Sequence, residues 1–359
     1  FRLASQHHSL TAMLLLAVSL LSFVLLGTLP IHGVAAAAAF TLITFDVDGT
    51  LVKGSGKAAE ASVHARAFSH AVGTVLGNGV AVKPVAEALP RPKYHGSTDG
   101  LILLRLAKAE LGIESSDSFP RLQEMFDSMY DFVSAMPDEE IARGILPLPG
   151  VVDKLTTLAR CKEQGVLCGL VTGNVEGIAR RKMRAVGITA TGALAAPPSL
   201  EQQQQDWAGA NDIGFLGGFG SDFCSGNIDN DERNHLDRCE QIAIAVRRCK
   251  EYISSQINNN ENENNKLSRV VHVGDAPADI LAAKAYADRL EQEGNSDDLV
   301  VGVVGVATGS YPADLLRELA GEPRLGKWEP VVLQDGIADP NFLSACGVHL
   351  KKEEEEQEQ

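Results

Sequence analysis

The chain has 359 residues, of which 45% are hydrophobic and 22% charged, which is ordinary for a globular protein with one large and one smaller domain. Its formal net charge is −15, and an acidic surface of this size repels nucleic acid and anionic membranes. We therefore expect no nucleic-acid partner, and an anionic substrate would need a local positive site such as a bound divalent cation.

An apolar segment precedes the first predicted strand. Residues Met13 to Leu29 carry no charge, and the small residues Gly33 to Ala39 follow them. The segment is typical of a signal for secretion or organelle import, or of a membrane anchor, and the Ala39-Phe40 junction resembles the cleavage site of plastid presequences. Another interpretation is an upstream extension outside the mature enzyme. We exclude residues 1–39 from the fold and expect membrane contact only through this segment, if it is retained; a chain without a targeting signal would be cytoplasmic.

Short apolar runs alternate with helical patterns along the rest of the chain. This alternation predicts a parallel sheet covered by helices, and continuous apolar runs are expected for strands buried on both faces. The fold class is therefore α/β, with a Rossmann-like doubly wound parallel sheet. The predicted strands are Phe40–Phe45, Val166–Val171, Ile213–Phe219, Val270–Val273, Val300–Val304 and Val331–Leu333.

More than a hundred residues separate the first two predicted strands, without a convincing strand among them. Three helices are expected there, at Ala58–Gly73, Gly100–Leu111 and Phe119–Ala135. The pattern predicts a sheet domain at 40–56 and 146–340 with a helical domain inserted at 57–145. The acidic tail 351–359 cannot bury apolar surface and is expected to be disordered.

The strongest functional pattern is Phe45-Asp46-Val47-Asp48-Gly49-Thr50-Leu51, directly after the first strand. Carboxylates at the carboxyl end of a strand lie where open α/β sheets bind ligands. Of Asp46 and Asp48, one could attack phosphorus or hold a metal while the other gives and takes protons. Gly49 permits a sharp turn. The alternative is a solvated Asp-Gly turn without a chemical role.

A second pattern, Leu170-Val171-Thr172-Gly173-Asn174, ends the second predicted strand. A hydroxyl group together with free backbone N–H groups at the start of a helix suits phosphate oxygens. The alternative is an ordinary N-cap before the helix predicted at Val175–Val186.

A third pattern, Val273-Gly274-Asp275-Ala276-Pro277-Ala278-Asp279, follows the fourth predicted strand. Mg²⁺ prefers oxygen ligands, usually one or two carboxylates with waters and substrate phosphate, and Asp275 and Asp279 offer two carboxylates. Pro277 fits the first turn of a helix. The alternative is that Asp275 caps this helix and Asp279 is solvated.

In this order, the three patterns resemble those of the haloacid dehalogenase superfamily of phosphohydrolases over about residues 40–335. The helical insertion is similar to the helical cap of its phosphoglycolate-phosphatase-like branch, and Thr172–Asn174, Gly217–Asp222 and His95–Asp99 look like segments of one subgroup of that branch. The resemblance implies a core of this superfamily's type with an inserted α-helical cap domain, Mg²⁺ as cofactor and a small phosphorylated metabolite as substrate.

The resemblance also implies a role for each matched carboxylate. Asp46 would be the nucleophile and a Mg²⁺ ligand. Asp48 would protonate the leaving oxygen and then activate water, and its backbone carbonyl would ligate Mg²⁺. Asp275 would ligate the metal, and Asp279 would ligate it or orient its waters.

The phosphate site that the resemblance implies combines Gly49 with the second pattern. The hydroxyl of Thr172 would hydrogen-bond the transferring phosphoryl group, and Gly173 and Asn174 would complete the loop around it. Phosphoryl transfer depends mainly on such positioning and on stabilisation of charge.

The family also requires a Lys or Arg beside the nucleophile, but no Lys-Pro follows the third predicted strand here. Arg233 stands in the corresponding place, before the helical run Asn234–Val246. Lys182 is the other candidate, because it shares a helical face with apolar residues and can point inward. The choice between them stays open, and either could be a surface residue.

These patterns predict a Mg²⁺-dependent phosphatase that forms an aspartyl-phosphate and hydrolyses a small phosphate monoester, with phosphoglycolate as the family's default substrate. A phosphosugar mutase of the same superfamily is an alternative, because it shares Asp46 and Asp48. A dehalogenase is disfavoured, since that reaction does not need the acid/base group of Asp48. A catalytically silent, membrane-tethered binding protein is the alternative outside enzymes.

Overall fold

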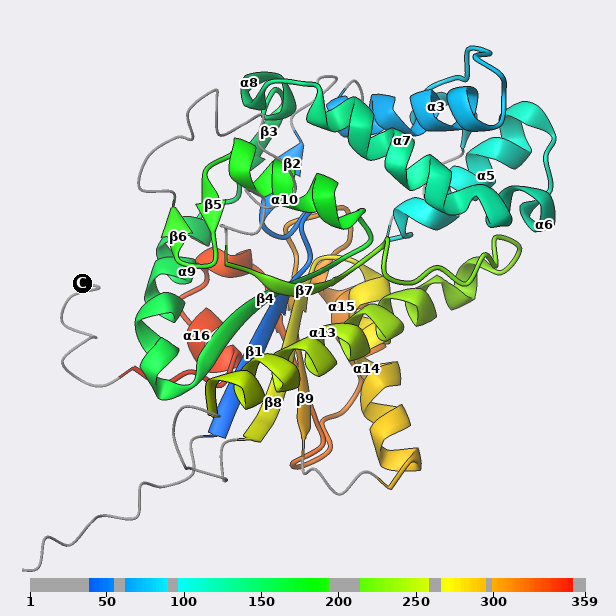
Figure 1. Ribbon diagram of the computed structural model, residues 1–359. Coiled ribbons are helices and arrows are strands. Elements are labelled where there is room, and N and C mark those ends of the chain that lie inside the picture. The colour runs from blue at the N-terminus through cyan, green and yellow to red at the C-terminus, as the bar shows by residue number, and fades with distance from the viewer. Residues whose placement is uncertain are drawn as a thin grey trace, which may run out of the picture. The chain divides into compact units, whose positions relative to one another are not determined.

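The computed structural model describes residues 39–54, 62–89, 96–193, 214–257, 266–294 and 299–350. In this part of the chain a parallel six-stranded sheet has the order β10-β9-β8-β1-β4-β7 (Figure 1). The predicted α/β sheet is confirmed, and each predicted strand is present with shifted ends; the third begins at Leu216, and Ile213 lies outside the described residues. The strands are β1 (Ala39–Phe45), β4 (Val166–Thr172), β7 (Leu216–Phe219), β8 (Lys266–Gly274), β9 (Val300–Val306) and β10 (Trp328–Leu333).

Strand β1 lies in the middle of the sheet, between β4 and β8. Its last residue, Phe45, is in register with Leu170 of β4 and with Val273 of β8. The chain runs from β1 to one side of the sheet and later returns to the other side, so β1 stands at the topological switch point. Ligands bind at this point in open α/β sheets, outside the carboxyl ends of the strands.

Helices cover both faces of the sheet, because alternate residues of each strand point in opposite directions. Ile43 and Phe45 pack with α9 (Val151–Arg160), α10 (Glu176–Ala185) and α16 (Phe342–Ala345). Leu42 packs on the other face, where the covering helices are α13 (Asn234–Ile257), α14 (Pro277–Gln292) and α15 (Ala313–Ala320). The sheet is therefore doubly wound, with an apolar core on each face. Each such apolar side chain contributes about 1.5–3 kcal/mol on burial.

A helical segment interrupts the chain between β1 and β4, and we call it the helical insertion, residues 63–141. It is bracketed by two short strands that pair antiparallel with each other, β2 (Val52–Gly54) and β3 (Ile145–Pro147). Its apolar core also includes Val175 and Ile178 at the start of α10, and it belongs to the same compact unit as the sheet. Its helices are α3 (Val63–Val75), α4 (Val85–Ala88), α5 (Asp99–Leu111), α6 (Ser115–Ser118), η1 (Phe119–Arg121), α7 (Leu122–Ser134) and α8 (Asp138–Ile141).

The three predicted helices of this insertion exist with shifted ends. The first begins at Val63, while residues 58–61 lie outside the described residues. The third is preceded by a 3₁₀ turn at Phe119–Arg121, because Pro120 lies in its first turn and lacks a backbone N–H. Strands β2 and β3 were missed, because three residues are too few to produce an alternating pattern.

The remaining elements are short. They are η2 (Cys161–Gln164), β5 (Ile188–Thr189), β6 (Gly192–Ala193), η4 (Asp231–Arg233) and η5 (Gly336–Ala338). Over the described ranges, we find no helix with the length and apolar character needed to span a bilayer. Residues 1–38, which contain the predicted signal or anchor segment, and the acidic tail 351–359 lie outside the described residues, so both stay predictions.

Close packing between β7 and α13 gives a prediction about stability. A Cβ atom at Gly218 would collide with the backbone carbonyl of Gln241 on α13. We expect Gly218→Ala to lower the free energy of unfolding by about 1–3 kcal/mol, because the helix must move away from the sheet. The measurement is urea unfolding followed by circular dichroism.

Gly302→Ala in β9 is the matched control, because the nearest atom to a Cβ there is a methyl group of Val271 at 3.2 Å, which can yield. A loss for Gly218→Ala that does not exceed the loss for Gly302→Ala would contradict the packing argument.

Candidate active site

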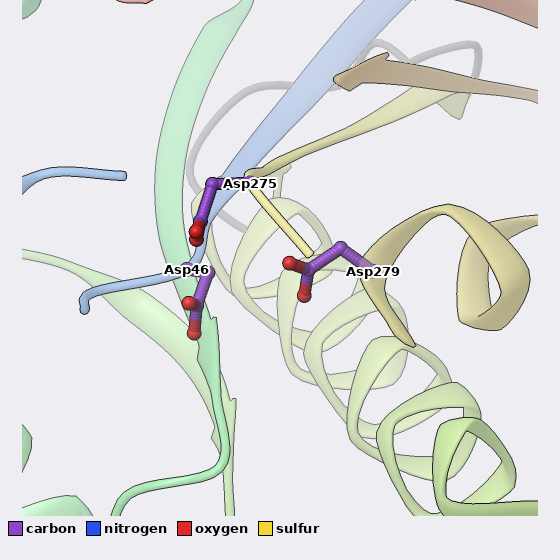
Figure 2. Close-up of side chains that lie close together, drawn as sticks. All are labelled: Asp46, Asp275 and Asp279. Atoms are coloured by element: carbon purple, nitrogen blue, oxygen red, sulfur yellow. The ribbon is translucent and has the colours of Figure 1, made fainter. Parts of the chain in front are cut away.

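Three carboxylates from two neighbouring strand ends gather at the switch point. Asp46 follows β1, Asp275 follows β8, and Asp279 lies in the first turn of α14. One carboxylate oxygen from each lies within 4.8 Å of the other two (Figure 2). All three side chains are buried, at 6%, 7% and 0% exposure. The structure therefore brings together three of the four predicted metal-ligating residues.

The turn after β1 depends on Gly49, whose φ of +93° is a left-handed conformation that favours glycine. A Cβ atom there would collide with the carboxylate of Asp275. Neighbouring Thr50 donates its hydroxyl to Oδ1 of Asp275 over 3.3 Å, and Thr308 donates to the carbonyl of Gly49 over 2.6 Å. The turn thus lets Asp275 approach the backbone that carries Asp46 and Asp48.

Arg238, on α13, is the cation beside the candidate nucleophile. Its Nη1 atom lies 3.1 Å from Oδ1 of Asp46 and forms an ion pair with Oδ1 of Asp279. The guanidinium is 3% exposed, and burial opposes its charge, but the carboxylates of Asp279 and Asp46 raise the pKa of Arg238 above its ordinary value. One buried guanidinium therefore joins β1, α13 and α14.

Burial and the neighbouring charges shift the pKa values of Asp46 and Asp279 in opposite directions. Burial raises the pKa of Asp46 to about 7, although Arg238 opposes this shift, and the negative charges of Asp279 and Asp48 add to it. Burial also acts on Asp279, but Arg238 and a hydrogen bond from His272 outweigh it and lower the pKa of Asp279 to about 2. Asp279 is therefore the fixed charge of the cluster.

The structure corrects the prediction that Arg233 is the cation beside the nucleophile. Its side chain is exposed in the turn before α13 and does not line the cavity described below. Arg238, five residues later, takes the position beside Asp46. The sequence carries a signal for it, because Arg238 shares a helical face with buried Ile242 and Ala245, where a charge requires a buried partner.

Lys182, the other predicted cation, points inward but pairs with Asp48 instead of Asp46. Its Nζ atom lies 2.7 Å and 3.0 Å from the two oxygens of Asp48 and 2.9 Å from Oδ1 of Asn174. The side chain of Asp48 is 52% exposed, so loss of hydration opposes the shift only weakly, and the charges of Lys182 and then of His64 hold the pKa of Asp48 below its ordinary value. The carboxylate of Asp48 lies outside the three-carboxylate cluster, so the structure separates the environments of the two motif carboxylates.

The loop after β4 closes one side of the site. Thr172 ends the strand with 1% exposure, and its hydroxyl accepts a hydrogen bond from the N–H of Asn174 over 3.4 Å. A Cβ atom at Gly173 would lie 2.6 Å from the carbonyl of Ser97, so only glycine permits this approach of the helical insertion. Gly220, from the predicted Gly217–Asp222 segment, donates to the carbonyl of Asn174 over 2.8 Å and supports the loop from behind.

A cavity of about 480 Å³ connects these groups, a size typical of sites for small molecules. Asp46, Asp48 and Asp275 line it together with Lys182 and Arg238. All predicted phosphate-binding residues also line it: Gly49, Thr172, Gly173 and Asn174. The helical insertion contributes Gly96, Ser97 and Asp99 of the predicted His95–Asp99 segment, whose His95 lies outside the described residues. The cavity therefore lies between sheet and insertion.

The donor set at the cluster fits a divalent cation. Three buried carboxylates face a single guanidinium, and burial with the charges of Asp279 and Asp46 raises the pKa of Asp275 well above its ordinary value. A hard cation would compensate this excess of negative charge. The oxygens of Asp279 already accept from Arg238, from His272 over 3.2 Å and from the N–H of Ala276 over 3.0 Å. Asp46 and Asp275 are therefore the better ligands, and Asp279 is better placed to orient them.

Comparisons with known proteins add little. No family model matches the chain, and no curated protein matches it. Among solved structures, CbbY from Rhodobacter sphaeroides in complex with phosphate aligns at 14% identity and a TM-score of 0.44, over 86% of this chain and 100% of that one. The archaeal β-phosphoglucomutase from Pyrococcus sp. strain ST 04 aligns at 17% identity and a TM-score of 0.32, over 76% and 88%. Similarity this low supports no conclusion about activity.

The position of Arg238 predicts a large effect on stability. We expect Arg238→Gln to lower the free energy of unfolding by about 3–5 kcal/mol, because removing one partner of a buried ion pair leaves Asp279 charged and uncompensated. Arg233→Gln should change it by no more than about 0.5 kcal/mol, as for exposed residues. Urea unfolding of both variants measures the difference, and equal values would contradict the assignment of Arg238.

Proposed function

We propose that the protein hydrolyses small phosphate monoesters through an aspartyl-phosphate on Asp46. The observation that carries this proposal is the pair of motif carboxylates, which line one cavity but have different partners. Asp46 lies beside Arg238 and Asp275, whereas Asp48 pairs with Lys182. Two carboxyl groups in different environments can divide nucleophilic and acid/base work.

In the first step, a carboxylate oxygen of Asp46 attacks phosphorus and the bond from phosphorus to the ester oxygen breaks. The anionic phosphate of a bound substrate would oppose the lowering of the pKa of Asp48 by Lys182, so that Asp48 could then supply the proton that the leaving alcohol needs. In the second step, Asp48 takes a proton from water, and the resulting hydroxide attacks the phosphorus of the aspartyl-phosphate. Inorganic phosphate leaves, Asp46 is regenerated, and one difficult hydrolysis is divided into two easier displacements.

Positive and hydrogen-bonding groups around the cavity would hold the phosphoryl oxygens. We assign this role to the hydroxyl of Thr172, the N–H groups of the Gly173–Asn174 loop and the side chains of Lys182 and Arg238, all of which line the cavity. Each preorganised donor is typically worth about 10²–10³ in rate. Mg²⁺, held by Asp46 and Asp275 with the backbone carbonyl of Asp48, would reduce the repulsion between an anionic nucleophile and an anionic substrate.

The resemblance of the three motifs to the haloacid dehalogenase superfamily supports the same proposal. In that comparison the helical insertion would be a cap of the phosphoglycolate-phosphatase-like branch. The partner would be a small phosphorylated metabolite, since the cavity of about 480 Å³ has room for a phosphate group with a short alcohol part.

Turnover of p-nitrophenyl phosphate by the purified protein tests the proposed function. We expect release of p-nitrophenol in the presence of Mg²⁺, loss of this activity after chelation by EDTA, and a loss of about 10⁴-fold or more in Asp46→Asn, because that amide is a poor nucleophile. Asp153→Asn on the exposed surface of α9 is the control and should keep wild-type activity.

Three other outcomes would change the assignment. Unchanged turnover in Asp46→Asn would remove that residue from its role. Conversion of a sugar phosphate to its isomer in the presence of the sugar bisphosphate, with little free phosphate, would favour a mutase. Absence of turnover for every monoester would favour a binding protein.

Direct binding of Mg²⁺ or Mn²⁺ tests the carboxylate cluster without an assay of activity. We expect a single site by titration calorimetry, weakened about 10-fold or more by Asp275→Asn, because that variant removes one of the two available carboxylates. Asp153→Asn should bind the ion like the wild type. Equal affinity in Asp275→Asn would show that the ion binds elsewhere.

A further inference from the structure

His64 is a cavity residue that the proposed chemistry does not use. It lies in the first turn of α3 in the helical insertion and lines the same cavity as Asp48, with its side chain 12% exposed. Its Nε2 atom lies 3.0 Å from Oδ2 of Asp99. Since an ionised carboxylate only accepts hydrogen bonds, Nε2 carries a proton and donates to Asp99.

Asp99 is fixed from the opposite side by the loop after β4. Its Oδ2 also accepts the N–H of Val175 over 2.8 Å, and its own N–H donates to the carbonyl of Gly173 over 2.7 Å. With 2% exposure, Asp99 has little freedom to move. The orientation of the His64 ring is therefore set by the phosphate-binding loop, through one buried carboxylate.

The second ring nitrogen of His64, Nδ1, has no hydrogen-bond partner in the described part of the chain. The ring of Phe68 lies 4.9 Å from that of His64, and Val85 and Ile102 line the same cavity as His64. Among the described residues, Nδ1 of His64 is not one of the buried polar atoms without a partner, so it is accessible and can hydrogen-bond a ligand group that enters the cavity.

We propose that His64 determines specificity by hydrogen-bonding an oxygen on the alcohol part of the substrate, and that Asp99 is the positioning residue that orients it. This inference rests on the proposed phosphatase function. The preferred substrates are monoesters with a hydroxyl on the carbon next to the ester carbon. With Nε2 donating to Asp99, Nδ1 would accept a hydrogen bond from that hydroxyl, while the attack on phosphorus would take place at Asp46.

The test compares glycerol 1-phosphate with propyl phosphate, which has the same number of carbons but no hydroxyl groups. The variants are His64→Leu, which fills the space without a hydrogen bond, and Asp99→Asn, which keeps an acceptor for Val175 but removes the charge. His70→Ala is the control, because His70 lies on the same helix with its ring against Phe132, 4.7 Å away, and does not line the cavity.

We expect the wild type to prefer glycerol 1-phosphate, and His64→Leu to lower kcat/KM for it by about 5–10-fold, the usual effect of losing a hydrogen bond between neutral groups. The change should appear in KM with kcat nearly constant, since ground state and transition state both lose the contact. Propyl phosphate should change by less than about threefold. Asp99→Asn should lose part of the same preference, and His70→Ala should keep it.

Several results would overturn the proposal while leaving the proposed function in place. Equal losses on both substrates in His64→Leu would show that His64 supports the fold or the chemistry at phosphorus, and a thermal unfolding midpoint would separate these two cases. A wild type without preference would also overturn it. If neither ester is hydrolysed in an Asp46-dependent manner, the proposed function fails first, and the role of His64 fails with it.

Discussion

The buried contact of Arg238 with Asp46 and Asp279 is the interaction on which both the fold and the candidate site depend. It joins a strand and two helices that are far apart in the sequence, inside the protein where the guanidinium is 3% exposed. A charge buried to this extent costs several kcal/mol unless it is paired with good geometry. The packing of α13 and α14 against β1 is therefore coupled to the electrostatics of the nucleophile, and neither can change alone.

Further polar contacts connect Asp279 to residues inside strands β8 and β1. Oδ1 of Asp279 also lies 3.2 Å from Nε2 of His272, whose Nδ1 lies 3.1 Å from the hydroxyl of Thr44. These groups are buried, and each satisfies a neighbour that would otherwise be unpaired. Because its position is set by the core, Asp279 stays a fixed negative charge, while Asp46 and Asp275 line the cavity, where a cation could bind them.

Local patterns in the sequence predicted the sheet and the residues at its edge. Each motif directly follows the apolar run that forms its strand, so both are visible in one short segment of sequence. They did not identify Arg238, since its role comes from the packing of α13 on the sheet, and the family pattern pointed to Arg233 instead. Lys182 was correctly expected to point inward, but only the fold shows that its partner is Asp48. The His64–Asp99 contact joins two helices of the insertion and has no local signature.

The pairing of β2 with β3 has a consequence for how such a protein can evolve. Val52 is in register with Pro147, and Gly54 with Ile145, so the chain leaves and re-enters the sheet region at neighbouring points. Antiparallel partners have Cα atoms about 4.5–5.5 Å apart. A segment of different length could be joined at two such points without displacing the strands that carry Asp46 and Asp275, provided that it also packs on Val175 and Ile178. Recombination at this junction could therefore replace the part of the cavity wall that contacts the alcohol and keep the reactive centre. Substrate selectivity could then change while the chemistry at phosphorus stays the same.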